Sequence, residues 1–253
     1  MSAAVKPASA SMSDAEWQAR CDLAALYRVV EYLGWTDLLE THMTVRVPGE
    51  PGAFLINNYG DMFDEITASS LVKMDIEGRV LGGGTKYNAA GFTIHSGIYK
   101  ACPDVACIMH SHTRAGAGIS VLRQGLRPIS QDALHVLDDV VYHEYGIPTS
   151  EEECIALGQS AQKGGSLILL NHGLLSAGQS IPAALYRLYM LERACEVEMI
   201  ARSMDEAPVL IEPHIVERAA RRQSTMRRQP EYGVRQWEAL RRRIDRDGAD
   251  YKR

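Results

Sequence analysis

The stretch VACIMHSHTRAG, residues 105–116, decides where the chain folds into a sheet and where that sheet carries polar groups. Its first five residues, Val105–Met109, are mostly apolar and predict a buried strand, and His110 and His112 follow at once. On a strand, residues i and i+2 point to the same side and lie about 7 Å apart along the chain. The stretch therefore predicts two imidazoles side by side at the end of a strand, an arrangement that suits a metal ion.

A second apolar stretch repeats this pattern. SLILLN, residues 166–171, predicts another buried strand, and His172 follows it, with Gly173 just after. If the two strands lie near each other, all three histidines converge at one end of the sheet. Three neutral histidines bind a divalent ion and leave a fourth position open for water or substrate, which is the catalytic arrangement for zinc. The alternative is that His110 and His112 are hydrogen-bonded structure and bind nothing.

Composition excludes several classes of protein. The 253 residues are 46% hydrophobic and 23% charged, as in ordinary globular proteins, and a net charge of -5 gives no sign of nucleic-acid binding. The N-terminal stretch lacks the apolar core of a signal peptide, and no apolar run approaches the length of a membrane span. Five scattered cysteines without a CxxC pair indicate reduced thiols. We therefore expect a soluble, cytoplasmic protein with neither a membrane nor a nucleic-acid partner.

Periodicity along the chain predicts one α/β domain. We expect helices over residues 14–34, 92–101, 150–163 and 181–204, strands over 43–47, 53–57 and 70–74, and a strand-like segment over 136–147. These elements predict a disordered N-terminal tail over residues 1–12, a single domain over 13–205 and a helical C-terminal extension over 206–253. Arginines alternate with apolar and acidic residues in the extension, which favours a solvated helix face or a subunit contact.

Several motifs together resemble the class II aldolase/adducin family, and above all the head domain of adducin. The motifs are MHSHTRAGAGIS (109–120), LLNHGLLSAGQS (169–180), ERACE (192–196) and FLINNYGDMFDEITASSLVKMD (54–75). The resemblance implies a three-layer α/β/α fold with a mostly antiparallel central sheet. It also implies a divalent metal on His110, His112 and His172, with zinc expected and manganese or iron as alternatives. A homotetramer with its site at a subunit interface is the assembly that it implies.

The sequence departs from the family's pattern at two kinds of position. Aldolases of the family carry an acid/base glutamate ahead of the HxH pair, and Gly91 stands at that position here. Their phosphate-binding turns correspond to Thr41-His42, Tyr59-Gly60 and Ala89-Ala90, and the two alanines offer no hydroxyl to a phosphate. We therefore expect a small substrate without a phosphate group.

Other polar side chains are candidates for the missing proton-transfer group. His42 stands where the family places a phosphate-binding asparagine, and Tyr142, His143 and Glu144 form a dense polar cluster after a predicted strand. The ordinary interpretation of such groups is packing, helix capping or an exposed turn, and the same holds for His95, His135, Lys86 and Asn88. Asn171 is a candidate to orient the ring of His172.

The sequence leaves two classes of function open. The first is a metal-dependent lyase that cleaves a C–C bond of a small carbonyl or carboxylate substrate, by retro-aldol reaction or decarboxylation, through a metal-stabilised enolate. The second is an adducin-like binding or assembly module with a vestigial metal site. The family also implies a branch of non-haem iron oxygenases.

Overall fold

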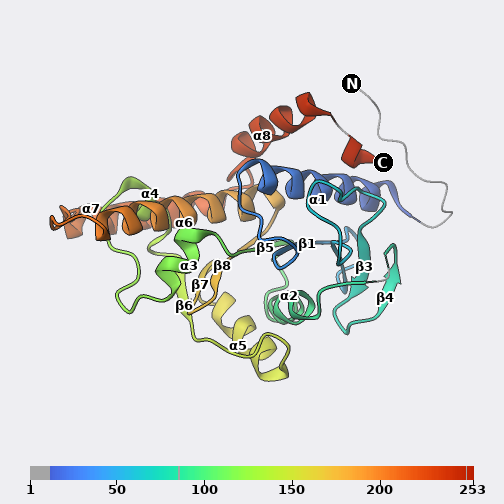
Figure 1. Cartoon of the computed structure of the whole chain (residues 1–253), viewed down its shortest axis with the longest axis horizontal. Helices are drawn as coiled ribbons and strands as arrows, with labels where there is room; N and C mark the ends of the chain where they lie inside the picture. The colour runs from blue at the N-terminus through green and yellow to red at the C-terminus, as the bar shows by residue number, and fades with distance from the viewer. Residues whose placement is uncertain (1–11, 85, 249) are drawn as a thin grey trace.

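An eight-stranded sheet forms the centre of the fold, in the order β4-β3-β2-β1-β5-β8-β7-β6 (Figure 1). The computed structural model describes residues 12–84, 86–248 and 250–253, so nearly all of the expected disordered tail lies outside the described residues. The strands are β1 (His42–Arg46), β2 (Ala53–Ile56), β3 (Val72–Asp75), β4 (Val80–Gly82), β5 (Cys107–Ser111), β6 (Val140–His143), β7 (Ser166–Leu169) and β8 (Gly173–Gly178). Every neighbouring pair is antiparallel except β6 and β7, which confirms the expected mostly antiparallel sheet.

Helices cover both faces of this sheet. The helices are α1 (Asp14–Tyr32), α2 (Ala89–Ala101), α3 (Arg114–Ser120), α4 (Gln131–Val136), α5 (Glu151–Ala161), α6 (Ile181–Arg202), α7 (Pro213–Arg227) and α8 (Val234–Asp247), followed by a short 3-10 turn at Asp250–Lys252. Helices α2 and α5 lie on one face, and α1, α3, α4 and α6 lie on the other (Figure 1). The three-layer α/β/α architecture is therefore confirmed.

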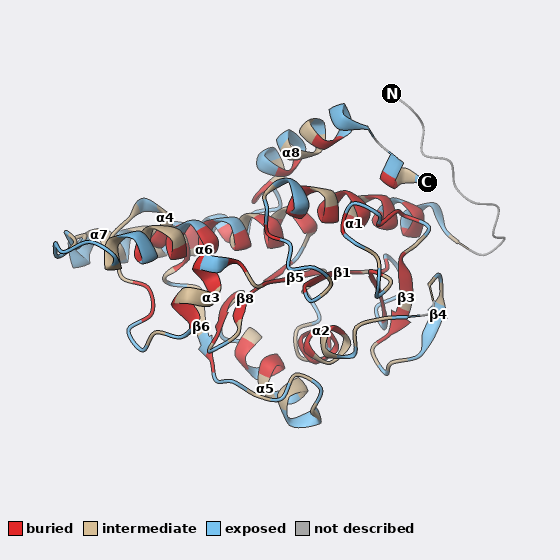
Figure 2. Ribbon diagram, viewed as in Figure 1, coloured by how far each residue is buried: buried red, intermediate tan, exposed pale blue. Residues whose placement is uncertain are grey.

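Alternation along the central strands divides the core into two parts. On β5, Cys107 and Met109 join the core under α1 and α6, while Ile108 between them joins the core under α2 and α5. Successive side chains of a strand point to opposite faces, so His110 shares the face of Ile108. The central strands are buried on both sides (Figure 2). The first histidine of the HxH pair thus faces the layer formed by α2 and α5.

Two parts of the sheet differ from the prediction. The segment over 136–147 is the end of α4, then a turn and the four residues of β6, rather than one strand. Residues Gly173–Gly178 were not expected as a strand, yet they form β8 in the middle of the sheet. Glycine and serine weaken the intrinsic strand preference of this segment, and complete burial between β5 and β7 overrides it. His172 consequently lies in the turn of a β7–β8 hairpin rather than at the end of an isolated strand.

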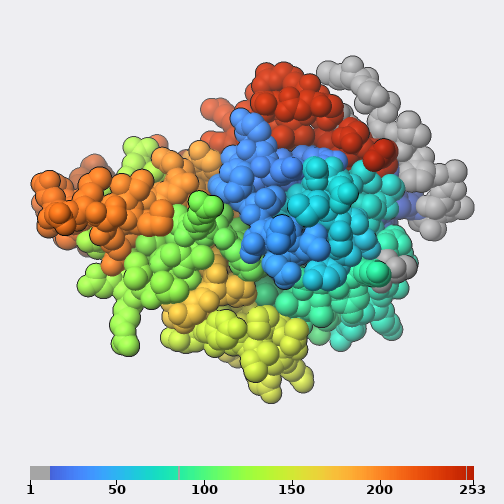
Figure 3. All heavy atoms as spheres, viewed as in Figure 1, coloured from blue at the N-terminus to red at the C-terminus, as the bar shows by residue number. Residues whose placement is uncertain are grey.

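The C-terminal segment is helical and packs on the rest of the chain. Trp237 and Ile244 of α8 and Tyr251 after it join the same hydrophobic core as α1. Helix α8 packs against α1 at the surface of the molecule (Figure 3). All five cysteines are free thiols. Within the described residues, none of the helices combines the length and apolar character that crossing a bilayer requires.

Candidate metal centre

Three histidines converge where β5 ends beside the β7–β8 turn. The register pairs Ser111 with Leu174, which brings His172 next to His110 and His112. One ring nitrogen from each residue lies within 4.8 Å of the other two, and the ring centroids of His110 lie 4.6 Å from His112 and 4.8 Å from His172. The predicted convergence is therefore present, and in the described part of the chain this ligand group contains no carboxylate.

Hydrogen bonds fix the tautomers of the first two rings. Nδ1 of His110 lies 2.9 Å from the carbonyl oxygen of Leu174, and Nδ1 of His112 lies 2.9 Å from a carboxylate oxygen of Asp37. Carbonyl and carboxylate oxygens only accept hydrogen bonds, so Nδ1 donates in each ring. The Nε2 atoms of the two rings lie 2.9 Å apart. A ligating histidine commonly donates its second N–H to a carbonyl or a carboxylate in this way, so this donor set fits a divalent metal.

The protonation states also suit a metal. Burial, followed by the neighbouring His42, His112 and His172, holds the pKa of His110 well below its usual range. Burial, followed by His112, lowers the pKa of His172 to about 4. Both imidazoles are therefore neutral at neutral pH, which is the form that binds a metal ion.

Asp37 is a functional candidate that the sequence did not reveal. It lies in the loop after α1, 75 residues before His112. Its carboxylate accepts a hydrogen bond from Nδ1 of His112 and so orients that ring. A ligating histidine commonly donates its second N–H to a carboxylate or a carbonyl in this way. Only the fold brings the two residues together, so no local pattern marks Asp37.

His42 lies against the three-histidine group. Its ring centroid is 5.1 Å from that of His110, and the cross-strand register of β1 and β5 pairs the two residues. Nδ1 of His42 lies 3.0 Å from Nε2 of His95, so His95, expected to be a packing residue, is the direct support of His42. Both side chains are almost fully buried.

Tyr142 and His143 make contacts away from this group. The two ring nitrogens of His143 lie 2.9 Å from the Ser160 hydroxyl and 3.2 Å from the Glu153 carboxylate, which ties β6 to α5. The hydroxyl oxygen of Tyr142 accepts a hydrogen bond of 2.7 Å from the backbone N–H of Leu126. These bonds give both side chains structural roles.

Another tyrosine of the same segment lies near the histidines. The ring of Tyr145 lies 6.4 Å from that of His172, and the side chain is exposed. Nothing in the sequence separates this tyrosine from its neighbours in the same turn. Glu144 beside it is exposed and lines a cavity of about 510 Å³.

The remaining candidates have local roles. Asn88 caps α2 by accepting hydrogen bonds from the backbone N–H groups of Ala90 and Gly91. His135 packs against the ring of Tyr186. Asn171 adopts a left-handed backbone conformation, with φ of 58°, and within the described residues we find no hydrogen bond from its side chain to His172.

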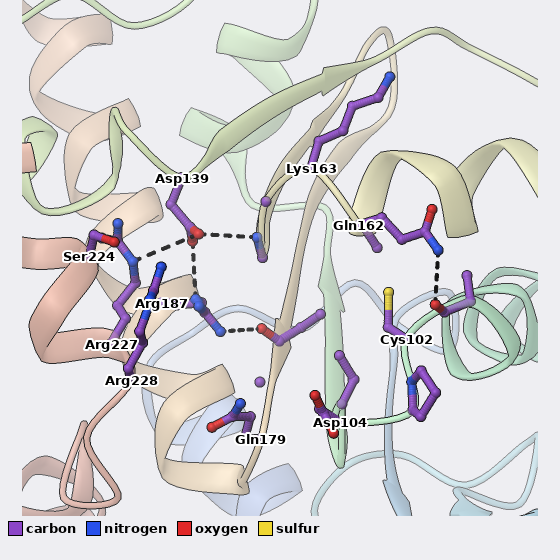
Figure 4. A pocket seen from close by; sticks show the side chains of 18 of the residues that line it. Cys102, Asp104, Asp139, Gln162, Lys163, Gln179, Arg187, Ser224, Arg227 and Arg228 are labelled. Atoms are coloured by element: carbon purple, nitrogen blue, oxygen red, sulfur yellow. Dashed lines mark hydrogen bonds and ion pairs between the residues drawn. The ribbon is translucent and has the colours of Figure 1, made fainter.

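A second polar cleft, of about 560 Å³, lies at the opposite end of β5, β7 and β8 (Figure 4). Arg187 and Arg227 point into it beside Asp139, and Arg227 also pairs with Asp138. Both arginines have carboxylate partners, and the ion pairs of Arg227 hold α7 against the residues that precede β6.

Comparison with known proteins places these features in a family context. Residues 21–199 match the family model described as Class II Aldolase and Adducin N-terminal domain. A Pseudomonas aeruginosa protein, provisionally named an aldolase class 2 protein, is 42% identical over 247 residues, covering 96% of this chain and 95% of the relative. Mouse alpha-adducin is 44% identical over 202 residues, covering 77% of this chain but 27% of the adducin.

Solved structures of similar proteins also superpose closely on this chain. The crystal structure of an aldolase II superfamily protein from Pseudomonas syringae superposes with a TM-score of 0.90 at 38% identity, covering 96% of this chain and 98% of that one. An L-fuculose 1-phosphate aldolase from Glaciozyma antarctica superposes with a TM-score of 0.83 at 29% identity, covering 99% and 98% of the two chains.

Proposed function

The chain belongs to the class II aldolase and adducin N-terminal domain family, and from that premise we propose that it is a divalent-metal-dependent lyase. It cleaves a C–C bond in a small carbonyl or carboxylate compound, by retro-aldol reaction or decarboxylation. The observation that carries this proposal is the convergence of one ring nitrogen from each of His110, His112 and His172 within 4.8 Å of one another.

In this proposal His110, His112 and His172 hold the ion, with zinc as the first choice for three imidazoles and manganese or iron as alternatives. When bound, the ion supplies a Lewis acid that favours negative charge on a substrate oxygen. The carbonyl of Leu174 and the carboxylate of Asp37 orient two of the rings. Among the described residues, the ligand group contains three histidines and no carboxylate. Water and substrate would therefore occupy the remaining coordination positions.

The substrate carries no phosphate in this proposal. A helix N-terminus binds phosphate through free backbone N–H groups. At the start of α2, the side chain of Asn88 already accepts from the N–H groups of Ala90 and Gly91. Ala89 and Ala90 add no hydroxyl. These contacts support a substrate without phosphate, and we propose a small hydroxy-oxo acid or 2-oxo acid.

A substrate screen tests the activity. Protein loaded with Zn²⁺, Mn²⁺ or Fe²⁺ is incubated with hydroxy-oxo acids and 2-oxo acids, and release of pyruvate, aldehyde or CO₂ is followed. We expect turnover of at least one compound, and its loss in His110→Ala and after chelation. Metal-loaded protein that turns over none of them would contradict the lyase proposal.

An adducin-like binding or assembly module is the second candidate. Gly91 provides no carboxylate, and the likeness to alpha-adducin supports this alternative. The two functions differ in what metal removal changes: a lyase loses turnover, whereas an assembly module retains its contacts. Oxygen uptake by the iron-loaded protein would instead indicate the oxygenase chemistry.

We further propose a cytoplasmic homotetramer. Free thiols at all five cysteines suit a reducing compartment, and the family supports the assembly. Light scattering at micromolar concentration is expected to give four times the 28.0 kDa chain mass. A monomeric mass would contradict the tetramer without affecting the metal centre.

A further inference from the structure

We propose that His42 contacts the substrate beside the metal centre through Nε2. Gly91 leaves space for the His42 ring, and a hydrogen bond from His95 orients it. The inference rests on the proposed function, because it needs a ligand at the three-histidine group. The His42 imidazole then forms part of the wall of that site, and the ligand is a small anion with oxygen atoms.

The space for the His42 ring depends on Gly91. A Cβ atom at residue 91 would lie 2.7 Å from Cδ2 and 3.0 Å from Nε2 of His42, both closer than ordinary van der Waals contact. Residue 91 lies in the first turn of α2, whose backbone runs directly along this edge of the ring. A side chain at residue 91 and an imidazole at residue 42 therefore exclude each other.

A chain of buried hydrogen bonds holds the other edge of the ring. Nδ1 of His42 lies 3.0 Å from Nε2 of His95, and Nδ1 of His95 lies 2.7 Å from the hydroxyl of Thr44. That hydroxyl lies 2.8 Å from the hydroxyl of Tyr99. The chain links two strand residues to two residues of α2, and it satisfies every polar atom of these groups except Nε2 of His42.

The direction of these hydrogen bonds determines whether Nε2 of His42 is a donor or an acceptor. If Tyr99 donates toward Thr44, each following group donates in turn, and Nε2 of His42 carries a proton. If the chain runs the other way, Nε2 presents a lone pair. The His42 ring can thus donate to a substrate oxygen or accept from a substrate hydroxyl.

The position of His42 favours contact with a substrate over contact with the ion. Its ring lies beside that of His110, with 5.1 Å between centroids. Its nitrogens nevertheless fall outside the group of donor atoms that lie within 4.8 Å of one another. A group next to the ligands but outside their set is placed to contact what the ion binds.

The first experiment measures binding of a probe anion. Protein is loaded with Co²⁺, whose visible absorption reports the centre, and is titrated with oxalate. We expect His42→Phe to bind Co²⁺ with unchanged affinity and oxalate about tenfold to a hundredfold more weakly, as for loss of a hydrogen bond to a charged group. His42→Asn, which keeps a donor, should lose less. His95→Phe, which removes the support of the ring, should weaken oxalate binding and leave Co²⁺ affinity unchanged.

The second experiment tests the exclusion between residues 42 and 91 without metal. Gly91→Ala is expected to lower the melting temperature of the apo-protein, and the same change in a His42→Ala background is expected not to. Gly118→Ala is the matched control in another helix, because a Cβ there would meet only Met199 Sδ at 3.7 Å. Equal behaviour of Gly91→Ala and Gly118→Ala would overturn the proposed packing.

The outcomes separate this inference from the proposed function. If the wild-type protein binds no Co²⁺, the metal-dependent function and this inference both fail. If Co²⁺ binds and oxalate does not, or oxalate binds equally to wild type and His42→Phe, the inference alone is overturned. Should His42→Phe fail to fold, the comparison of wild type with His42→Asn and His95→Phe decides in the same way.

Discussion

Asp37 is the residue whose removal should weaken the metal centre without removing a ligand. Its carboxylate accepts a hydrogen bond from Nδ1 of His112 and so leaves Nε2 for the proposed ion. We expect Asp37→Asn to lower metal affinity about tenfold to a hundredfold, as for other partners of ligating histidines. Competition with a chelator measures the affinity. Asp104→Asn, an exposed carboxylate at the other end of β5, is the control, and equal affinity in both variants would contradict the role of Asp37.

Glu192 gives the molecule a pH dependence of defined sign. Burial raises its pKa to about 7, and its carboxyl bonds to Thr113, next to His112. Because the pKa is about 4.5 when unfolded, the unfolded chain releases this proton first, and stability falls as pH rises from about 4.5 to about 7. Glu192→Gln has no such proton.

The variant should therefore gain stability relative to wild type across this pH range and keep a constant difference above it. Urea unfolding at several pH values measures the difference. A difference that does not change with pH would show that Glu192 titrates normally.

At the scale of elements, the β7–β8 turn decides whether His172 reaches the other histidines. A Cβ at Gly173 would lie 2.4 Å from the carbonyl oxygen of Ser111 and 3.1 Å from Cδ2 of His112. We expect Gly173→Ala to push β8 away from β5, to cost about 1–3 kcal/mol of unfolding free energy, and to reduce metal affinity. Gly52→Ala, where a Cβ meets nothing within 4 Å, is the control for urea unfolding. A Gly173→Ala variant that keeps both the unfolding free energy and the metal affinity of the wild type would contradict this account of the turn.

The same turn shows what the sequence can and cannot predict. Long amphipathic segments such as α6 were predicted closely, because a repeated apolar stripe survives small errors. Strand β8 was missed because its place between β5 and β7, and not its own residues, makes it a strand. The three histidines were predicted as a group from their strand contexts. Asp37 and the pairing of His42 with Gly91 were not, because both depend on tertiary contacts.

At the scale of the whole molecule, Arg227 fastens α7 to the sheet. Its buried guanidinium pairs with Asp139 (Figure 4). It also pairs with Asp138 and donates to the backbone carbonyl of His135. We expect Arg227→Ala to cost about 1.5–3 kcal/mol, because it removes the hydrogen bonds of a buried guanidinium to Asp138 and to the His135 carbonyl. Arg228→Ala, at the exposed neighbouring position, should change stability by less than about 0.5 kcal/mol. Equal effects of the two changes on urea unfolding would contradict the role given to the extension.

The central claim is that three imidazoles from β5 and the β7–β8 turn hold one divalent ion. Metal analysis of protein purified at neutral pH without chelator tests it most directly, with His112→Ala prepared in parallel. We predict about one ion per chain in the wild type and a large loss in the variant, since three nitrogen ligands become two. A wild-type protein that contains no metal, and gains none on incubation with Zn²⁺, Mn²⁺ or Fe²⁺, would contradict the claim.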